Sequence, residues 1–462
     1  MQIISNPSRN QWAQLLQRPH LNSQNLTAIV DEVLNRIRTE GDAAIRDYEL
    51  QFDKAHLTDL QVSEAEMQEA EALVSNELKQ ALQTAKANIA TFHAAQKHQL
   101  PKVETTQGVT CWQKAVPIEK VGLYVPGGTA PLFSTVLMLA IPAQIAGCSE
   151  IVLCTPPNAE GKVNPIILYA AQLSGVSKVF KIGGIQAIGA MAYGTESVPK
   201  VYKIFGPGNQ YVMAAKQQVS LHDVAIDMPA GPSEVAIIAD ETANPASVAA
   251  DMLSQAEHGK DSQSIVFTTD ADFALQIQAE VEKQTAIAPR KEFIQCSLGH
   301  SKIFVLKSMD DVIAMSNEYA PEHLIIMCKD YAKVAEQITN AGSVFMGYYT
   351  PESAGDYASG TNHTLPTSGY AKAYSGVNLD SYLKKITFQE ITKEGLEKLG
   401  PTIEIMAENE LLMAVIKLST IICPKMNTKK IKSRYLTNCI VLLKRVHMFS
   451  MFTRNELRRT TL

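Results

Sequence analysis

Apolar residues recur at helical spacing through the first hundred residues of the chain. Over residues 23–52 they fall three or four positions apart, which is the period of one helical face. The same spacing continues over 63–97, with acidic residues at the ends of the run. This pattern predicts two amphipathic helices that pack in an α/β protein, preceded by an arm with a short helix. The first helical face consists of Leu26, Ile29, Val30, Val33, Leu34 and Ile37.

The pattern changes at Val116, where short apolar runs alternate with glycine turns and longer apolar stretches. The short runs have the length of buried strands, and the longer stretches have the length of helices. Strand, glycine turn and helix, repeated in this order, are typical of a parallel sheet with crossover helices. The expected strands are 121–125, 151–154, 178–181 and 203–205, and the expected helices are 134–146 and 166–173.

A second unit of the same kind begins near Ala225. A loop over 226–234, rich in Pro and Gly, leads into an apolar strand. This loop either presents Ser233 to a substrate or serves only as a connector. The two units together predict an α/β fold with parallel sheets. The strands expected in the second unit are 235–239, 264–267, 302–305, 324–326 and 344–346.

Glycine turns at the carboxyl ends of parallel strands are where such sheets bind nucleotides. Turns of this kind follow three expected strands, at 127–128, 183–184 and 206–208, although no G-x-G-x-x-G is present. Any one of them could be a tight connection between a strand and a helix. Three in succession on one edge favour a degenerate dinucleotide site.

The stretch 254–261, which reads SQAEHGKD, predicts the end of a helix that stops at Gly259. Gln255 and His258 are three residues apart, so on a helix they share one face. An imidazole beside an amide oxygen can form half of a metal site. The alternative is that His258 is a surface cation that stabilises the carboxyl end of the helix.

Two later stretches carry further candidate chemistry. Glu322 and His323 are adjacent between Pro321 and an apolar strand, where a carboxylate can raise the basicity of an imidazole or activate water. The alternative for this pair is an ordinary surface turn. A long polar loop over 351–363 offers Asp356 as a metal ligand and His363 as a substrate contact.

Composition narrows the class of protein. The chain has 462 residues, which is enough for more than one domain, and its 46% hydrophobic and 19% charged residues are typical of a soluble globular protein. Neither a membrane-spanning stretch nor a signal peptide is expected. Seven Cys without paired spacing predict reduced thiols and a cytoplasmic location. A net charge of −5 makes nucleic acid an unexpected partner.

Charged residues are also unevenly distributed along the chain. Residues 416–462 contain eleven Lys or Arg and a single acid, Glu456, whereas the rest of the chain is strongly acidic. The basic end therefore differs in composition from the enzyme body.

Several long motifs resemble the histidinol dehydrogenase family, the enzymes of the last step of histidine biosynthesis. The resemblance covers roughly residues 20 to 412. The motifs that carry it, which occur in the family's order and spacing, are DMPAGPSE, LSQAEHG, YAPEHL and GDYASGTNH, with VGLYVPGG, PLFSTVLMLA, KIFGPGN and TSGYAK.

The resemblance implies oxidation of L-histidinol through a bound aldehyde to L-histidine, with two NAD⁺ used in turn. It also implies a zinc-dependent homodimer with two incomplete Rossmann-like domains and small terminal domains exchanged between subunits. The implied roles are zinc ligands for Gln255, His258 and Asp356; acid–base catalysis for Glu322 and His323; NAD contacts for Tyr124, Gln186 and Asn209; and substrate contacts for Ser134, Ser233, Gln255, His258, His323, Asp356, His363 and Glu410.

On this interpretation the chain divides into five parts. They are an arm (1–22), a first Rossmann-like domain with the zinc and catalytic loops (23–123 and 226–375), a second on the NAD side (124–225), a helical segment (376–412) and an atypical tail (413–462).

Residue chemistry agrees with the implied roles. Oxidation of an alcohol releases a proton, and His323 is a suitable base near neutral pH. Glu322 can position or deprotonate the water that adds to an aldehyde. The imidazole and amine of histidinol are good zinc donors, so a metal would orient the substrate.

A rival hypothesis is a thiol-dependent aldehyde dehydrogenase with Cys148 or Cys154 as the nucleophile. Both lie in apolar sequence, which raises a thiol pKa and favours inert core residues. The other rival is a non-catalytic or impaired member of the same fold, and the tail is the reason to consider it.

In the family a His-Lys pair follows the glutamate that matches Glu410, and that His is the remaining zinc ligand. Here the His position holds Val415, which cannot bind zinc. The likeness and the acidic composition both end at this point, which suggests a shifted reading frame. If Val415-Ile416-Lys417 is encoded GTC-ATA-AAR, another frame reads His-Lys. The alternative is a genuinely replaced tail with His447 as a substitute ligand.

Overall fold

The computed structural model describes residues 1–19, 24–127, 131–229 and 231–412. The predicted basic tail, with Val415 and His447, lies outside this part of the chain. The described residues form two compact units. The larger consists of 1–98 and 116–384, and the smaller contains 99–115 and the chain from Lys385.

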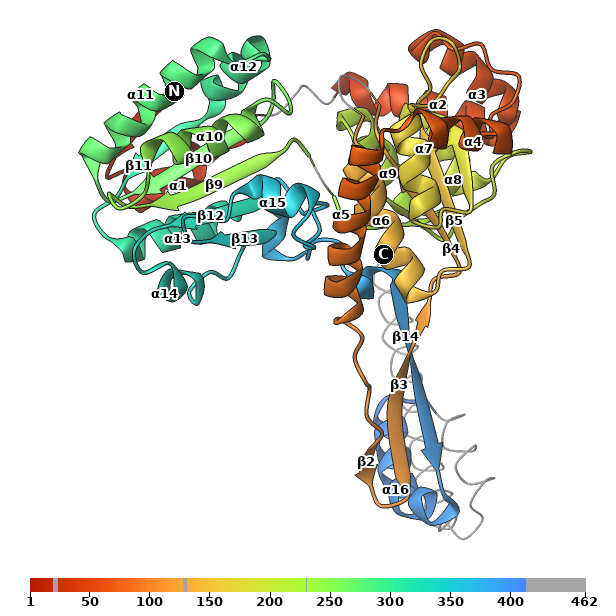
Figure 1. The fold of residues 1–462 in the computed structure, drawn as a ribbon. Coiled ribbons are helices and arrows are strands. Elements are labelled where there is room, and N and C mark those ends of the chain that lie inside the picture. Colours follow the sequence, from red (N-terminus) through yellow and green to blue (C-terminus); the bar gives the residue numbers. More distant parts are fainter. Residues whose placement is uncertain (20–23, 128–130, 230, 413–462) are drawn as a thin grey trace, which may run out of the picture. The chain divides into compact units, whose positions relative to one another are not determined.

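A six-stranded sheet forms one half of the larger unit (Figure 1). Its strand order is β1-β11-β10-β9-β12-β13, and every neighbouring pair is parallel. Parallel pairing with helices on both faces explains why the sequence shows continuous apolar runs rather than alternation. The strands are β1 (Gln2–Ser5), β9 (Glu234–Ala239), β10 (Gln263–Thr268), β11 (Lys302–Val305), β12 (His323–Met327) and β13 (Ser343–Met346).

Two apolar cores lie on the two faces of this sheet. One is built with α10 (Pro245–Ala256), α11 (Ala271–Ile287) and α12 (Lys291–His300). The other is built with α1 (Arg9–Leu15), α13 (Met309–Tyr319) and α14 (Tyr331–Ala335). Strand β1 was not predicted from the sequence, because only four residues near the terminus carry its pattern.

A five-stranded parallel sheet with the order β6-β5-β4-β7-β8 forms the other half of the larger unit. This order, in which the first strand lies between the second and the fourth, is that of a Rossmann-like sheet. The two parallel sheets confirm the predicted α/β class. The strands are β4 (Lys120–Tyr124), β5 (Glu150–Thr155), β6 (Lys178–Lys181), β7 (Lys203–Phe205) and β8 (Ala225–Ile226).

Helices from two regions of the sequence cover the five-stranded sheet. The crossover helices are α6 (Phe133–Ala146), α7 (Pro165–Leu173), α8 (Gly184–Tyr193) and α9 (Gln210–Ser220). The N-terminal helices α2 (Gln24–Glu40), α3 (Asp42–Tyr48), α4 (Glu64–Leu73) and α5 (Asn76–Ala94) share apolar cores with them. The sequence analysis instead grouped 23–123 with 226–375.

Each long amphipathic run in the N-terminal region is interrupted once. The run over 23–52 breaks at Gly41, which has a φ of 56° and lies against the Glu196 carboxylate, so a side chain there would collide with it. The run continues as α3 and the short π-helix η1 (Glu49–Asp53). The run over 63–97 breaks before α5, whose N-cap is Ser75, the acceptor for the Leu78 N–H.

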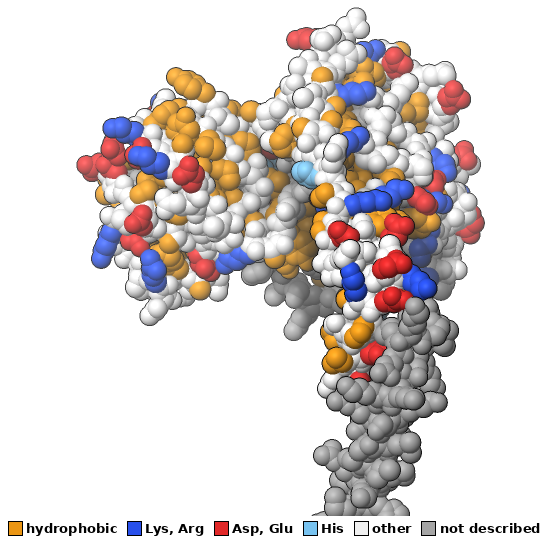
Figure 2. All heavy atoms as spheres, turned by 90° about the horizontal axis from the view of Figure 1, so that it is seen from below, with side chains coloured by type: hydrophobic (Ala, Val, Ile, Leu, Met, Phe, Trp, Pro, Cys, Tyr) orange, Lys and Arg blue, Asp and Glu red, His pale blue; other side chains and the backbone are white. Residues whose placement is uncertain are grey.

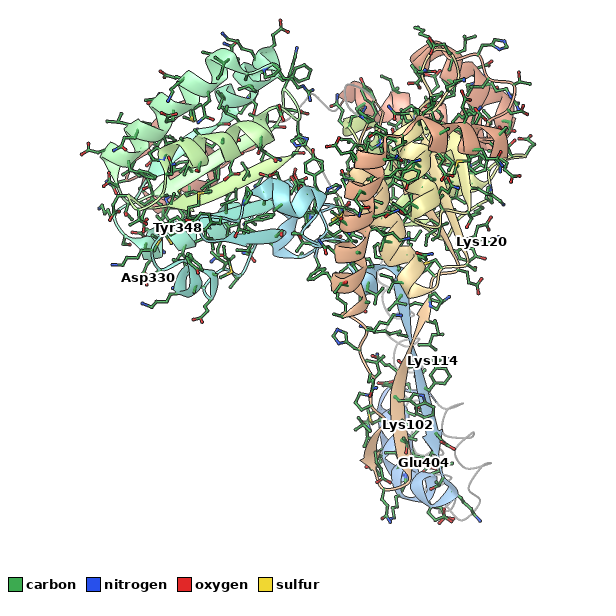
Figure 3. The ribbon with its side chains drawn as sticks, in the orientation of Figure 1. Lys102, Lys114, Lys120, Asp330, Tyr348 and Glu404 are labelled. Carbon is green, nitrogen blue, oxygen red and sulfur yellow. The ribbon has the colours of Figure 1, made fainter. Side chains whose placement is uncertain are left out.

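The smaller unit is built around the three-stranded sheet β14-β3-β2 and helix α16. The sequence analysis expected only helix over 376–412, whereas residues 383–391 form β14. The alternation of Ile386 and Phe388 with polar neighbours suits a strand, and Phe388 stacks on Trp112 with ring centroids 5.5 Å apart. Lys102, which is labelled in Figure 3, lies over the Trp112 ring, with its Nζ 4.2 Å from the ring centroid. The elements are β2 (Val103–Thr106), β3 (Val109–Pro117), β14 (Leu383–Ile391) and α16 (Lys393–Asn409).

The remaining short elements of the larger unit are α15 (Glu352–Tyr357), η2 (Tyr370–Lys372) and η3 (Leu379–Tyr382). None of the described helices combines the length and apolar character needed to cross a membrane. Charged and apolar side chains are intermixed on the face drawn in Figure 2.

Candidate active site and cofactor cavity

The predicted catalytic residues lie at the amino edge of the six-stranded sheet. Strand β9 begins at Glu234 and its neighbour β12 begins at His323, and His323 lies beside Val235 in the parallel register. Two elements bring further polar groups to this edge: α10 with Gln255 in its last turn, and α15 with Asp356. The site therefore lies at the edge opposite to the carboxyl ends where α/β sheets usually bind ligands.

The main chain of Glu234 holds both predicted catalytic side chains. Its N–H donates to Glu322 Oε2 at 2.8 Å, and its carbonyl accepts from His323 Nδ1 at 3.2 Å. Because a carbonyl oxygen can only accept, Nδ1 carries the proton when the imidazole is neutral. Nε2 of His323 is then the lone-pair nitrogen. It is buried and has no hydrogen-bond partner among the described residues.

The carboxylate of Glu234 is itself neutralised. Arg18 donates to it through two nitrogens, at 2.7 and 2.9 Å, and the Ser368 N–H donates to the same group at 2.7 Å. Arg18 also lies over the ring of Tyr319 and donates to its carbonyl at 2.7 Å. This buried bidentate pair fixes the start of β9.

Three carboxylates surround the His323 imidazole. Its Nδ1 lies 3.7 Å from Glu322 and 3.5 Å from Glu352, and its Nε2 lies 3.5 Å from Asp356 Oδ1. Burial alone would lower the pKa of His323, but the carboxylates of Glu352, Glu322 and Asp356 raise it well above its usual value. Burial raises the pKa of Glu322 to about 8 and that of Glu352 to about 8. The site is therefore built to take up a proton near neutral pH.

Gln255 is almost completely buried, with 1% of its surface exposed. Its amide orientation follows from its hydrogen bonds: the Glu234 N–H donates to its oxygen at 2.9 Å, and its nitrogen donates to Glu352. The predicted shared helical face with His258 is wrong, because α10 ends at Ala256 and His258 lies in the turn that follows. His258 is exposed there, and its imidazole interacts electrostatically with Asp356 and His323.

His363 links the site to the other sheet. Its Nδ1 lies 2.8 Å from the Asp356 carbonyl, and its Nε2 lies 3.1 Å from Thr135 Oγ1 in the first turn of α6. Ser134, a predicted substrate contact, is the buried neighbour of Thr135, and Ser233 directly precedes β9. Glu410 is exposed at the carboxyl end of α16 in the smaller unit, so its predicted role stays a prediction.

Two residues of this site were missed in the sequence analysis, Glu234 and Glu352. Glu234 closes the DMPAGPSE motif, and Glu352 lies in the same polar loop as Asp356. Either could have been noticed as an acid inside a candidate loop, but nothing in the sequence indicates that the Glu234 main chain and the Glu352 carboxylate both meet His323. Among the described residues, ligand atoms of His323, Glu352 and Asp356 lie within 4.8 Å of one another.

The donor set suits a zinc ion. Imidazole nitrogens, carboxylates and an amide oxygen are ligands that zinc accepts in enzymes. The unpartnered His323 Nε2 and the excess of buried carboxylates are both features that a cation would stabilise. The residues present therefore fit the metal that the motifs imply.

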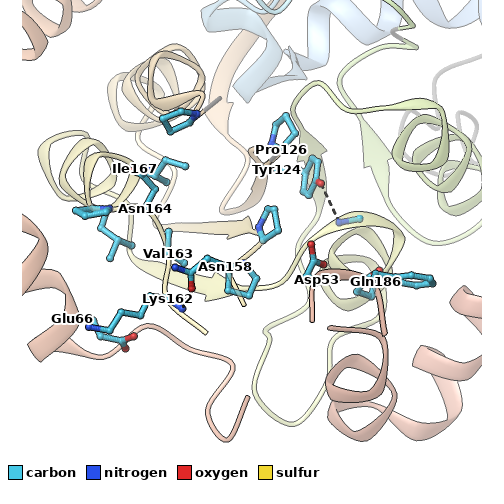
Figure 4. A pocket seen from close by; sticks show the side chains of 18 of the residues that line it. Asp53, Glu66, Tyr124, Pro126, Asn158, Lys162, Val163, Asn164, Ile167 and Gln186 are labelled. Carbon is cyan, nitrogen blue, oxygen red and sulfur yellow. Dashed lines mark hydrogen bonds between the residues drawn. The ribbon is translucent and has the colours of Figure 1, made fainter. Parts of the chain in front are cut away.

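A cavity of about 1030 Å³ lies at the carboxyl ends of β4, β5 and β6 (Figure 4). All three residues predicted to contact NAD line it: Tyr124, Gln186 and Asn209. The Tyr124 hydroxyl accepts from the Gly184 N–H at 3.1 Å, and Asn209 caps α9 by accepting from two main-chain N–H groups. The cavity thus contains the amino ends of α8 and α9, which favour bound phosphate.

A pair of carboxyl groups lies in the wall of this cavity. Glu49 is fully buried and accepts from the Gly183 N–H at 2.9 Å and from Gln186 Nε2 at 2.8 Å. Its carboxyl group interacts electrostatically with that of Asp53, which lines the cavity. Burial raises the pKa of Glu49 to about 8 and also raises the pKa of Asp53. The pair therefore holds a proton at neutral pH.

The cysteines do not support a thiol mechanism. Burial raises the pKa of Cys148 to about 11 and raises that of Cys154 further. Neither residue lines the cavity. Such thiols are poor nucleophiles at neutral pH.

The structure has the arrangement expected of a dehydrogenase: two Rossmann-like sheets, a cavity large enough for a dinucleotide, and a buried imidazole among carboxylates. Comparison with known proteins gives the particular family. The histidinol dehydrogenase family model matches residues 16–418, and the chain belongs to this family of oxidoreductases.

Individual relatives agree with the family match. The chain is 62% identical to a histidinol dehydrogenase of Bacteroides thetaiotaomicron over 93% of its length and 100% of the relative. It is 53% identical to the histidinol dehydrogenase of Escherichia coli O6:H1, covering 87% of this chain and 93% of that one. A crystal structure of histidinol dehydrogenase from Elizabethkingia anophelis is 55% identical, with a TM-score of 0.90, and the match covers 92% of this chain and 99% of that one.

The raised pKa of Glu49 predicts a pH-dependent effect on stability. The unfolded chain loses this proton near pH 4.3, about the ordinary value for Glu, whereas the folded chain keeps it up to about pH 8. The folded state binds more protons in this window, so its stability falls as pH rises. Glu49→Gln mimics the protonated group, so its melting temperature relative to wild type should rise between pH 5 and about 8.

Thermal unfolding at several pH values measures this difference. Glu69→Gln, which alters an exposed carboxylate on the same cavity wall, is the matched control and should show a constant offset. A Glu49→Gln offset that is equally independent of pH would contradict the buried proton.

Proposed function

We propose that this chain oxidises L-histidinol to L-histidine through L-histidinal, the final step of histidine biosynthesis, with zinc and two NAD⁺ used in turn. The observation that carries the proposal is the state of His323. Its Nδ1 is held by the Glu234 carbonyl, and its Nε2, which has no hydrogen-bond partner among the described residues, lies 3.5 Å from Asp356, one of the carboxylates that stabilise the protonated ring.

In the first oxidation, His323 acts as the base. The alcohol loses a hydride from carbon to NAD⁺ and a proton from oxygen, and Nε2 is the nitrogen free to take that proton. Glu352 and Asp356, both 3.5 Å from the ring, stabilise the imidazolium that forms. The products of this step are histidinal, NADH and a proton.

In the second oxidation, Glu322 activates water. A water molecule adds to the aldehyde carbon and gives a hydrate, which loses a hydride to the second NAD⁺ and a proton to the protein. The raised pKa of Glu322 makes its carboxylate a stronger base than an exposed one. The Glu234 N–H at 2.8 Å holds the carboxylate in place.

Gln255, His258 and Asp356 are the described residues that would hold zinc. A zinc ion bound there would orient the imidazole and amine of histidinol and polarise the alcohol oxygen. The further proposed substrate contacts are Ser134, Ser233, His363 and Glu410. In a homodimer, Glu410 would contact the substrate bound to a second copy of the chain. Tyr124, Gln186 and Asn209 would contact NAD in the cavity.

The cysteines agree with a reducing compartment. The five Cys of the described residues are free thiols, which fits the cytoplasm. The alternative of an impaired family member is not favoured, because the family match extends to residue 418 and the Bacteroides relative is matched over its whole length. The proposed loss of a zinc ligand at Val415 concerns residues outside the described part and stays a prediction.

We predict that the two catalytic residues divide the reaction between them. His323→Ala should slow both oxidations by about 100-fold or more, because it removes the base. Glu322→Gln should release the first NADH from histidinol at a rate near that of wild type and then stall. Stopped-flow NADH formation with histidinol and with histidinal separates the steps, and His300→Ala, an exposed histidine at the end of α12, is the control. Equal losses with both substrates in Glu322→Gln would argue against this division.

We also predict that the zinc ligands can be removed without unfolding the chain. His258→Ala and Asp356→Ala should each lower the bound zinc per chain while the circular dichroism spectrum stays unchanged, because both residues lie outside the apolar cores. Elemental analysis of the purified proteins measures this, again with His300→Ala as the control. Full zinc occupancy in both variants would contradict the assignment of these residues as zinc ligands.

A further inference from the structure

The cofactor cavity lacks one residue that dinucleotide-binding sheets ordinarily supply. In those sheets an acid near the end of the second strand binds the hydroxyl groups of the adenosine ribose. The second strand here is β5, and the chain leaves it as Cys154-Thr155-Pro156-Pro157-Asn158, without a carboxylate. If the cavity binds a dinucleotide, another segment has to provide this contact.

Asp53 lies at this place although it comes from the N-terminal region. A side chain added at Gly183 would meet Pro156 at 2.7 Å and Asp53 Oδ2 at 3.2 Å, so the three residues converge at the carboxyl ends of β5 and β6. Figure 4 shows Asp53 in the cavity wall between Asn158 and Gln186. Asp53 thus takes the position that an acid on β5 would otherwise occupy.

A second acid, Glu49, lies beside Asp53. It is fully buried and is fixed by the Gly183 N–H and by Gln186. Burial raises the pKa of both carboxyl groups, and Asp53 is the one of the two that lines the cavity. A carboxylate of this kind accepts strong hydrogen bonds from ribose hydroxyls.

The same wall offers no free cation to a phosphate group. Lys162 is the one basic residue among the described lining residues, and its Nζ lies 3.3 Å from Glu69. Lys181 nearby is paired with Glu66 at 2.6 Å. A 2′-phosphate on the ribose would therefore meet the Asp53 charge without a counter-ion.

We propose that Asp53 accepts the adenosine ribose hydroxyls and excludes a 2′-phosphate, so that the cavity selects NAD over NADP. This inference rests on the proposed dinucleotide function of the cavity, and it adds the residue that decides between the two cofactors.

Calorimetric titration of the full chain with NAD and with NADP, without histidinol, tests the assignment. Wild type should bind NAD more tightly. Asp53→Asn should reduce the preference for NAD by about tenfold or more, because a charge-assisted hydrogen bond is lost to one ligand and a repulsion is relieved for the other. Asp53→Ser serves as the second variant, and Glu71→Gln, which removes an exposed charge of α4 that does not line the cavity, should leave the preference within about threefold of wild type.

The ratio of the two dissociation constants is the decisive quantity, because general damage to the cavity would weaken both ligands alike. An unchanged ratio in both Asp53 variants overturns the assignment while leaving the dinucleotide function intact. An equal change in Glu71→Gln also overturns it, because the effect would then be one of net charge alone. A wild-type chain that binds neither dinucleotide overturns both proposals.

Discussion

The hydrogen bonds made by Glu234 are the constraint on which the rest of the candidate active site depends. Its main-chain N–H and carbonyl hold Glu322 and His323, and the same N–H meets the amide of Gln255. Its buried carboxylate would be costly without a partner, and the bidentate bonds from Arg18 supply that partner. A residue from the N-terminal region therefore secures the strand end that arranges two proposed catalytic groups and one proposed zinc ligand.

The cavity and the candidate active site lie at opposite edges of their respective parallel sheets. The five-stranded sheet provides its carboxyl edge, where helix amino ends surround the cavity, which is the usual place for a dinucleotide. The six-stranded sheet provides its amino edge, where α10 ends and α15 contributes Glu352 and Asp356. The bond between His363 and Thr135 joins the catalytic loop to α6 of the other sheet. The candidate active site and helix α6 are thus connected by a specific contact.

The features that the sequence predicts well are local ones. Buried parallel strands such as β9 and β12 carry unbroken apolar runs, and the adjacent Glu322 and His323 mark a reactive turn without any knowledge of the fold. What escapes prediction depends on contacts between distant segments. The break at Gly41 follows from the nearby Glu196 carboxylate, and the importance of Glu352 follows from the place of α15 beside His323. His258 was expected on a helix, but α10 ends two residues earlier. The spacing of apolar residues does not indicate at which residue the last turn of a helix ends.

The most direct test of this account is the number of NADH molecules formed for each histidinol consumed. Purified protein with zinc, limiting histidinol and excess NAD⁺ should give two NADH per histidinol, with histidine as the product, if the site around Glu322 and His323 completes both oxidations before release, as we propose. A ratio of one with free histidinal in solution would contradict the coupled reaction. An absence of NADH from zinc-loaded protein would contradict the proposed activity of this chain.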